Sequence, residues 1–136
     1  MADDVNQPPQ KARILVIDDH PTVVSALAYL LGSGFGHHVL TANGGEEGLR
    51  VAVRERVDLI LLDFDMPHMS GLDVLRALAL ENGIRKIPVL MMTGRPTPTV
   101  RQQGLAAGAI EVLAKPFDIE SLRTTLLRYL PRELTE

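Results

Sequence analysis

The sequence reads VDLILLD at residues 57–63, and this stretch decides the fold. Apart from the aspartates at positions 58 and 63, every residue in it is apolar. An apolar run without the alternation of a half-exposed strand is typical of a central parallel strand that is covered on both faces. Asp63 should therefore lie at the carboxyl end of a buried strand.

Similar apolar runs lie on both sides of this stretch, and each is followed by a helical pattern. Strands are also predicted at residues 13–18, 37–42, 87–92 and 109–114. The helix starts are predicted from residues that suit a cap or a first turn, namely Pro21, Asn43-Gly44, Ser70 to Asp73, Thr97-Pro98 and Asp118. Strands that each precede a helix, with short connections, imply an α/β fold: a five-stranded, doubly wound parallel sheet with helices on both faces.

Glycine and apolar spacing predict where some helices end and which face they bury. Gly32-Ser-Gly34 is expected to stop the first helix, and Asn82-Gly83 the third. The last helix should end at Pro131. It should bury one stripe, made of Ile119, Leu122, Leu126 and Leu130.

The composition is that of one globular domain. The chain has 136 residues, of which 46% are hydrophobic, and its net charge is −3. The slight excess of acid argues against direct nucleic-acid binding, which relies on clustered Lys and Arg. No apolar run approaches the roughly 20 residues that span a membrane. The absence of cysteine fits a reducing compartment, so a cytoplasmic location is expected.

The two ends of the chain differ in character from its centre. Residues 1–11 are polar and contain proline, so they are predicted to be a flexible lead-in and not a secretory signal. Residues 12–131 form the predicted domain. Residues 132–136 form a tail that is too short to fold as a further domain. Both a stand-alone protein and a piece of a longer one fit this pattern.

Charged and hydroxyl side chains follow several of the predicted strands. They are Asp18, Asp19, Asp63, Thr93 and Lys115. Because the carboxyl ends of parallel strands meet at one edge of a sheet, these side chains should converge there. Carboxylates held close repel one another unless a cation compensates, and their oxygens suit Mg²⁺. Lys115 and Thr93 suit a phosphate oxygen, and Asp63 on the central strand is the best nucleophile for phosphoryl transfer.

This ordered set resembles the receiver domain of response regulators, the CheY-like family of two-component signal transduction. The resemblance covers about residues 12–130. It rests on Asp18-Asp19, on Asp63 with Met66-Pro67 and Gly71 after it, on Thr93, and on Lys115-Pro116. It implies a flavodoxin-like fold with the strand order 2-1-3-4-5.

The resemblance also implies a role for each site residue. Asp63 would accept phosphate from a histidine kinase or a histidine phosphotransfer protein, and the domain itself would catalyse this transfer and the later dephosphorylation without being a conventional enzyme. Thr93 and Lys115 would bind the phosphoryl oxygens, and the Lys115–Pro116 peptide bond would be cis. Mg²⁺, with Mn²⁺ as an alternative, would be held by Asp18, Asp19, Asp63 and the backbone carbonyl of Asp65.

Phosphorylation is then expected to switch the binding of a partner. That partner would be a downstream effector or a fused output domain, and the protein would be a monomer or a phosphorylation-dependent homodimer. No membrane and no direct contact with nucleic acid are implied.

Two features depart from the family pattern or modulate it. Receiver domains usually carry Tyr or Phe three residues before the lysine, where this chain has Val112, which is too small for the inward movement of an aromatic ring. We therefore expect Thr93 and residues 94–108 to carry the signal. The resemblance implies that Asp65 and Arg95 occupy positions that tune hydrolysis of the aspartyl phosphate in this family. One hypothesis pairs them across the site, and the alternative leaves both as solvated charges.

Asp63-Phe-Asp65 also fits a different class, the haloacid-dehalogenase-like phosphatases, which use an Asp-x-Asp pair and turn over phosphomonoesters. The acidic pair Asp18-Asp19 precedes the nucleophile here, which argues against that alternative.

The histidines are not predicted to bind metal. His20 lies at a helix start, and His37 and His38 lie at a strand start. His68 lies in the loop after Asp63 and is expected to be the only histidine near the site.

Overall fold

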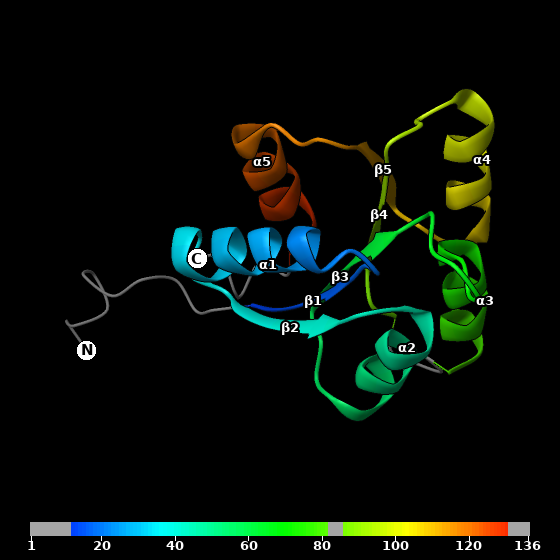
Figure 1. Ribbon diagram of the computed structural model, residues 1–136, viewed down its shortest axis with the longest axis horizontal. Coiled ribbons are helices and arrows are strands. Elements are labelled where there is room, and N and C mark those ends of the chain that lie inside the picture. The colour runs from blue at the N-terminus through cyan, green and yellow to red at the C-terminus, as the bar shows by residue number, and fades with distance from the viewer. Residues whose placement is uncertain (1–11, 82–85, 131–136) are drawn as a thin grey trace.

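A computed structural model describes residues 12–81 and 86–130 and shows one parallel sheet (Figure 1). Its strands are β1 (Arg13–Ile17), β2 (His38–Ala42), β3 (Leu59–Asp63), β4 (Val89–Thr93) and β5 (Glu111–Ala114). They lie in the order β2-β1-β3-β4-β5, which confirms the predicted topology. Every residue of the central strand β3 is buried, as the apolar run indicates.

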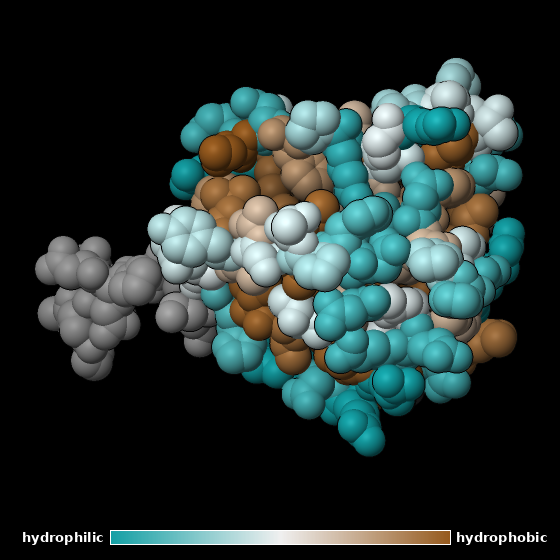
Figure 2. Space-filling model, viewed as in Figure 1, coloured by the Kyte–Doolittle hydropathy of each residue, from teal (hydrophilic) through white to brown (hydrophobic). Residues whose placement is uncertain are grey.

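Helices cover both faces of the sheet, as predicted. They are α1 (Pro21–Tyr29), the π-helical turn η2 (Leu30–Gly34), α2 (Gly45–Arg54), α3 (Gly71–Glu81), α4 (Pro98–Ala107) and α5 (Ile119–Tyr129). Helices α1 and α5 lie on one side of the sheet, and α2, α3 and α4 lie on the other (Figure 1). In Figure 2 apolar side chains show around α5, whereas the region of α2 is largely hydrophilic.

Alternation along the buried strands builds a separate core on each face. Ile14 and Val16 pack toward α1 and α5, while Leu15 and Ile17 pack toward α2 and α3. Successive side chains of a strand point to opposite faces, so each strand contributes to both cores. This double burial holds the carboxyl ends of the strands in a fixed arrangement.

Local caps start three of the helices as the sequence predicts. At α3, Asp73 accepts from the backbone N–H of Ser70, and the Ser70 hydroxyl accepts from the backbone N–H of Asp73. These reciprocal bonds form a capping box. At α4, Thr97 accepts from the N–H of Val100, and Asp118 at α5 accepts from Ser121 in the same way. The starts of the two helices that flank β5 are therefore fixed by side chains.

The first helix ends within its predicted stop, Gly32-Ser-Gly34, because a π-helical turn continues it to Gly34. The predicted stripe of α5 was wrong at its first residue. Ile119 is 52% exposed, so the buried stripe of α5 begins a turn later, at Leu122. The predicted stop at Asn82-Gly83, Pro131, the lead-in (1–11) and the tail (132–136) lie outside the described residues. Within the described ranges, no helix has the length and apolar character that a membrane crossing needs.

Candidate functional site

The strand ends bring the predicted site residues to one edge of the sheet. Asp18 and Asp19 follow β1, Asp63 ends β3, Thr93 ends β4, and Lys115 follows β5. Lys115 reaches back across this edge, and its Nζ lies 3.0 Å from Asp18 Oδ2 and 3.1 Å from Asp63 Oδ1. The peptide bond after Lys115 is cis, as the resemblance implies. Carboxylates far apart in the chain therefore share one ammonium group.

Burial and charge set the ionisation of this group of side chains. Asp63 is 2% exposed, and the neighbouring Asp18 is fully buried. Burial and the repulsion from Asp18 raise the pKa of Asp63 from its ordinary 3.8 to about 6, although Lys115 opposes the shift. Burial also lowers the pKa of Lys115, but its bonds to Asp18 and Asp63 outweigh this, and the pKa of Lys115 is raised. One ammonium group does not fully compensate the buried carboxylates.

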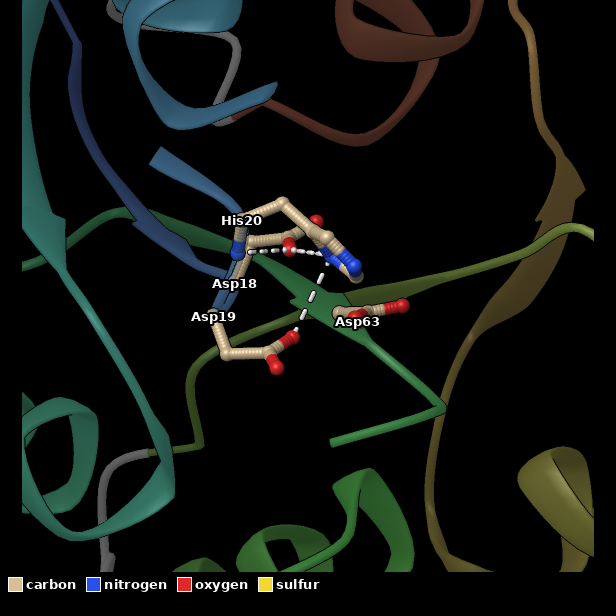
Figure 3. A group of neighbouring side chains, drawn as sticks. All are labelled: Asp18, Asp19, His20 and Asp63. Atoms are coloured by element: carbon tan, nitrogen blue, oxygen red, sulfur yellow. Dashed lines mark hydrogen bonds and ion pairs between the residues drawn. The ribbon is translucent and has the colours of Figure 1, made fainter. Parts of the chain in front are cut away.

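The arrangement of the remaining oxygens fits a divalent cation. Oδ2 of Asp63 is buried and has no hydrogen-bond partner, a state that is costly for a carboxylate oxygen. Asp18, Asp19, His20 and Asp63 each offer a ligand atom, and these atoms lie within 4.8 Å of one another (Figure 3). Hard oxygen ligands of this kind suit Mg²⁺. The residues present therefore fit the predicted cation.

The expectation that only His68 lies near the site was wrong, because His20 lies in it. Nδ1 of His20 is 3.1 Å from Asp18 Oδ1 and 3.3 Å from Asp19 Oδ1. The hydrogen bond to Asp18 and the charge of Asp19 raise the pKa of His20. Figure 3 shows the ring turned in from the start of α1 over the carboxylates. The sequence does contain a signal for the position of His20 at the site. His20 directly follows the aspartate pair and precedes Pro21 at the first turn of α1.

Thr93 lies at the site, and of the two alternatives for Asp65 and Arg95 the structure shows the exposed charges and not the ion pair. The Thr93 hydroxyl donates to Asp65 Oδ2 at 3.4 Å and accepts from the backbone N–H of Arg95 at 3.0 Å. Both Asp65 and Arg95 are exposed. It is the backbone of Arg95, and not its guanidinium, that contacts the site. Thr93 is fully buried, and its hydroxyl is hydrogen-bonded to both Asp65 and Arg95.

Comparisons with known proteins agree with this geometry. A model of the response regulator receiver domain matches residues 14–127. The chain belongs to this family. The receiver domain is 36% identical to the protein PilH of Pseudomonas aeruginosa, over 85% of the chain and 94% of PilH. It is 37% identical to the probable transcriptional regulatory protein TcrX of Mycobacterium tuberculosis over 90% of the chain, but that match spans only 51% of TcrX.

Solved structures show the same fold. The receiver domain superposes on the chemotaxis protein CheY4 of Vibrio cholerae with a TM-score of 0.82 and 35% identity, covering 88% of this chain and 99% of CheY4. The receiver domain of the sensor histidine kinase PA1611 from Pseudomonas aeruginosa gives a TM-score of 0.79 and 28% identity, covering 88% and 97%. That structure has a magnesium ion coordinated in its active site cleft.

Membership of this family settles the functional class. Receiver domains of response regulators interact with histidine kinases and output domains and are not conventional enzymes. The alternative of a haloacid-dehalogenase-like phosphatase has no support in these comparisons and is set aside.

The raised pKa of Asp63 predicts how the stability of the metal-free receiver domain depends on pH. Folding raises this pKa from 3.8 to about 6, so the contribution of Asp63 to stability is fully present below about pH 4 and is lost as the pH rises through about 6. Asp63→Asn removes this loss. The variant should be more stable than wild type by about 1–2 kcal/mol near pH 7, less than the full shift implies because solvent reaches the pocket.

Urea denaturation in the presence of a chelator, from about pH 4.5 to pH 7.5, measures this difference. The advantage of the variant should shrink toward the acidic end, and added Mg²⁺ should reduce it near neutral pH. A constant difference across the range would contradict the assignment of the raised pKa to Asp63.

Proposed function

We propose that this receiver domain accepts a phosphoryl group on Asp63 from a histidine kinase or a histidine phosphotransfer protein, with Mg²⁺ or Mn²⁺ bound beside it. One observation carries the proposal: Lys115 Nζ bonds both Asp18 and Asp63, while Oδ2 of Asp63 is buried without a partner. A nucleophile thus lies between a fixed ammonium group and a set of further carboxylates. Intact mass after incubation with Mg²⁺ and acetyl phosphate tests it, and one added phosphoryl group is expected.

In this proposal the transfer is a displacement at phosphorus. An oxygen of the Asp63 carboxylate forms the new P–O bond while the P–N bond of the phosphohistidine breaks, and the histidine leaves as neutral imidazole after taking up a proton. Lys115 stabilises the negative charge on the phosphoryl oxygens, and Thr93 donates its hydroxyl to one of them. Water later cleaves the acyl phosphate and regenerates Asp63. Both steps are proposed to be catalysed by the domain itself.

The cation would be held by Asp18, Asp19, Asp63 and the backbone carbonyl of Asp65. When bound, it offsets charge on the transferring group. The magnesium ion in the related receiver domain of PA1611 supports this assignment. The donor set of this chain supports it independently, because the ligand atoms already lie close together.

Asp65 and Arg95 are proposed to modulate how long the phosphoryl group persists. Asp65 lies beside the reacting edge, because its Oδ2 accepts from the Thr93 hydroxyl. A carboxylate there is placed to repel or orient the attacking water. Arg95 would act from the rim, since its side chain is exposed and its backbone N–H bonds Thr93.

The switch without an aromatic ring is proposed to run through direct packing of α4 on β5. Val112 is 2% exposed. A Cβ on Gly104 of α4 would lie 2.9 Å from Val112 Cγ2 and 3.0 Å from Met91 Sδ. The backbone of α4 is therefore packed directly against these two side chains. Met91 lies two residues before Thr93 on the same face of β4. A movement of Thr93 toward a phosphoryl group would therefore disturb the packing of α4 against β4 and β5.

Arg101 holds α4 in this position, because its Nη1 donates to the backbone carbonyl of Val112 at 3.0 Å. Arg101→Ala should loosen α4 and lower the free energy of unfolding by about 1 kcal/mol, as expected for one partly exposed hydrogen bond. Hydrogen exchange should show faster exchange of the α4 amides, with a smaller further change on adding beryllofluoride, a phosphoryl mimic. Gln102→Ala, at the exposed neighbouring position, is the control. Equal exchange in both variants would exclude Arg101 from the switch.

Large apolar side chains are exposed on α4 and on α5. Leu105 of α4 is 47% exposed, and Ile119 and Leu127 of α5 are 52% and 55% exposed. We propose that a downstream effector, a fused output domain or a second copy of the chain docks on these two helices once Asp63 is phosphorylated.

A further inference from the structure

The side chain of His20 is exposed to solvent but contacts two carboxylates of the site. Its side chain is 61% exposed, yet Nδ1 contacts oxygens of both Asp18 and Asp19. The backbone N–H of His20 also donates to Asp18 Oδ1 at 2.9 Å, which fixes the start of α1 against the carboxylate. As the residue before α1, His20 makes no side-chain cap to the helix. The ring is therefore oriented toward the carboxylates and not toward the helix.

We propose that His20 supplies a nitrogen ligand to the cation site, so that the site prefers Mn²⁺ and later first-row divalent ions over Mg²⁺. This inference rests on the cation site of the proposed function and deepens it. It assigns to one side chain of this chain a role in the choice of metal.

The distances carry the proposal. The ligand atoms of Asp18, Asp19, His20 and Asp63 already lie within 4.8 Å of one another. Opposite ligands of an octahedral ion at about 2.1 Å are about 4.2 Å apart, so the widest separation in the set exceeds that span by no more than about 0.6 Å. The unpartnered, buried Oδ2 of Asp63 is a second and independent sign that a cation belongs there. A groove of about 480 Å³ is lined in part by Asp19, so this carboxylate of the set borders open space.

Ligand chemistry then sets the preference. Mg²⁺ takes oxygen ligands almost exclusively. An imidazole nitrogen is a better ligand for first-row divalent metals, and its affinity for them is lowest at Mn²⁺ and rises toward the later metals. A set of three carboxylates and one imidazole is therefore a mixed oxygen and nitrogen site. With an all-oxygen set, the difference between the two ions would be smaller.

The test uses the whole chain, stripped of metal and titrated with Mn²⁺ and with Mg²⁺. Pulsed electron paramagnetic resonance of the Mn²⁺-loaded protein reports directly coordinated nitrogen as strong ¹⁴N modulation. His20→Asn replaces the nitrogen donor with an amide oxygen and keeps a good N-cap residue before α1. His68→Asn is the matched control, since His68 is exposed at a backbone φ of 67° that Asn tolerates.

Wild type and His68→Asn should show the ¹⁴N modulation, and His20→Asn should not. Calorimetry should show that His20→Asn lowers Mn²⁺ affinity by roughly tenfold or more and leaves Mg²⁺ affinity within about twofold. Bound Mn²⁺ without ¹⁴N modulation, or modulation that survives in His20→Asn, would overturn the assignment of His20 while the phosphoacceptor function stands. Failure of the wild type to bind either ion would instead refute the cation site, and with it the Mg²⁺-dependent transfer.

Discussion

Replacing Asp63 with Asn should abolish phosphorylation of this receiver domain. The amide of Asn is neutral and is a much weaker nucleophile than a carboxylate, so it cannot form the acyl phosphate. Asp63 is the last residue of the central strand, and Lys115 Nζ lies 3.1 Å from its Oδ1. No other carboxylate of the described residues combines the end of the central strand, this ammonium contact and a buried unpartnered oxygen. The expected loss is complete within detection.

Intact-mass spectrometry after incubation with Mg²⁺ and acetyl phosphate measures this. Wild type should gain one labile phosphoryl group, and Asp63→Asn should gain none. Asp118→Asn is the matched control, because Asp118 caps α5 and Asn is an equally good cap, so phosphorylation should be retained. An adduct of equal occupancy in Asp63→Asn would place the phosphoryl group elsewhere and refute the proposed function. Asp63→Asn is also expected to be more stable than wild type, so unfolding would not explain its loss of phosphorylation.

Replacing Lys115 with Met should have the second largest effect. The thioether keeps most of the side-chain volume but leaves Asp18 and Asp63 buried without their shared ammonium group. Removing one preorganised charge from a reacting centre commonly costs about 10²–10³-fold in rate, so phosphorylation by a small phosphodonor should slow by that order. The metal-free protein should also lose up to about 3 kcal/mol of stability, a loss that protonation of Asp63 limits.

The two effects are separable by experiment. The initial rate of adduct formation measures the slower phosphorylation. Urea denaturation in the presence of a chelator near pH 7 measures the loss of stability. Lys86→Met, at an exposed lysine away from the site, should change neither. Lys115→Arg tests whether charge alone suffices, and its broad planar group should restore stability better than rate. A phosphorylation rate in Lys115→Met within a few-fold of wild type would remove Lys115 from the reacting centre.

Periodicity in the sequence is enough to predict the sheet and the convergence of its acidic residues. The buried apolar run of β3 and the alternation of side chains along the neighbouring strands are local sequence patterns. Parallel strands place their carboxyl ends at one edge of the sheet whatever the details of packing. The caps at Ser70, Thr97 and Asp118 are predictable for the same reason, since each involves residues three positions apart. Asp18, Asp63 and Lys115 could thus be assigned to one site before any contact was known.

Contacts between side chains from different elements were not predictable. His20 over the carboxylates, Thr93 bonded to Asp65, and Arg101 bonded to the Val112 carbonyl all depend on how a loop or helix is seated on the sheet. Of the two alternatives left open for Asp65 and Arg95, the structure shows two exposed charges and not a pair, and it is the backbone N–H of Arg95 that contacts Thr93. By itself the sequence determined the strands and the acidic edge at their carboxyl ends, because these follow from backbone geometry and short-range periodicity. Tertiary structure alone decided which nitrogen and oxygen atoms meet, because a side-chain rotamer is selected by neighbours that lie far away in the chain.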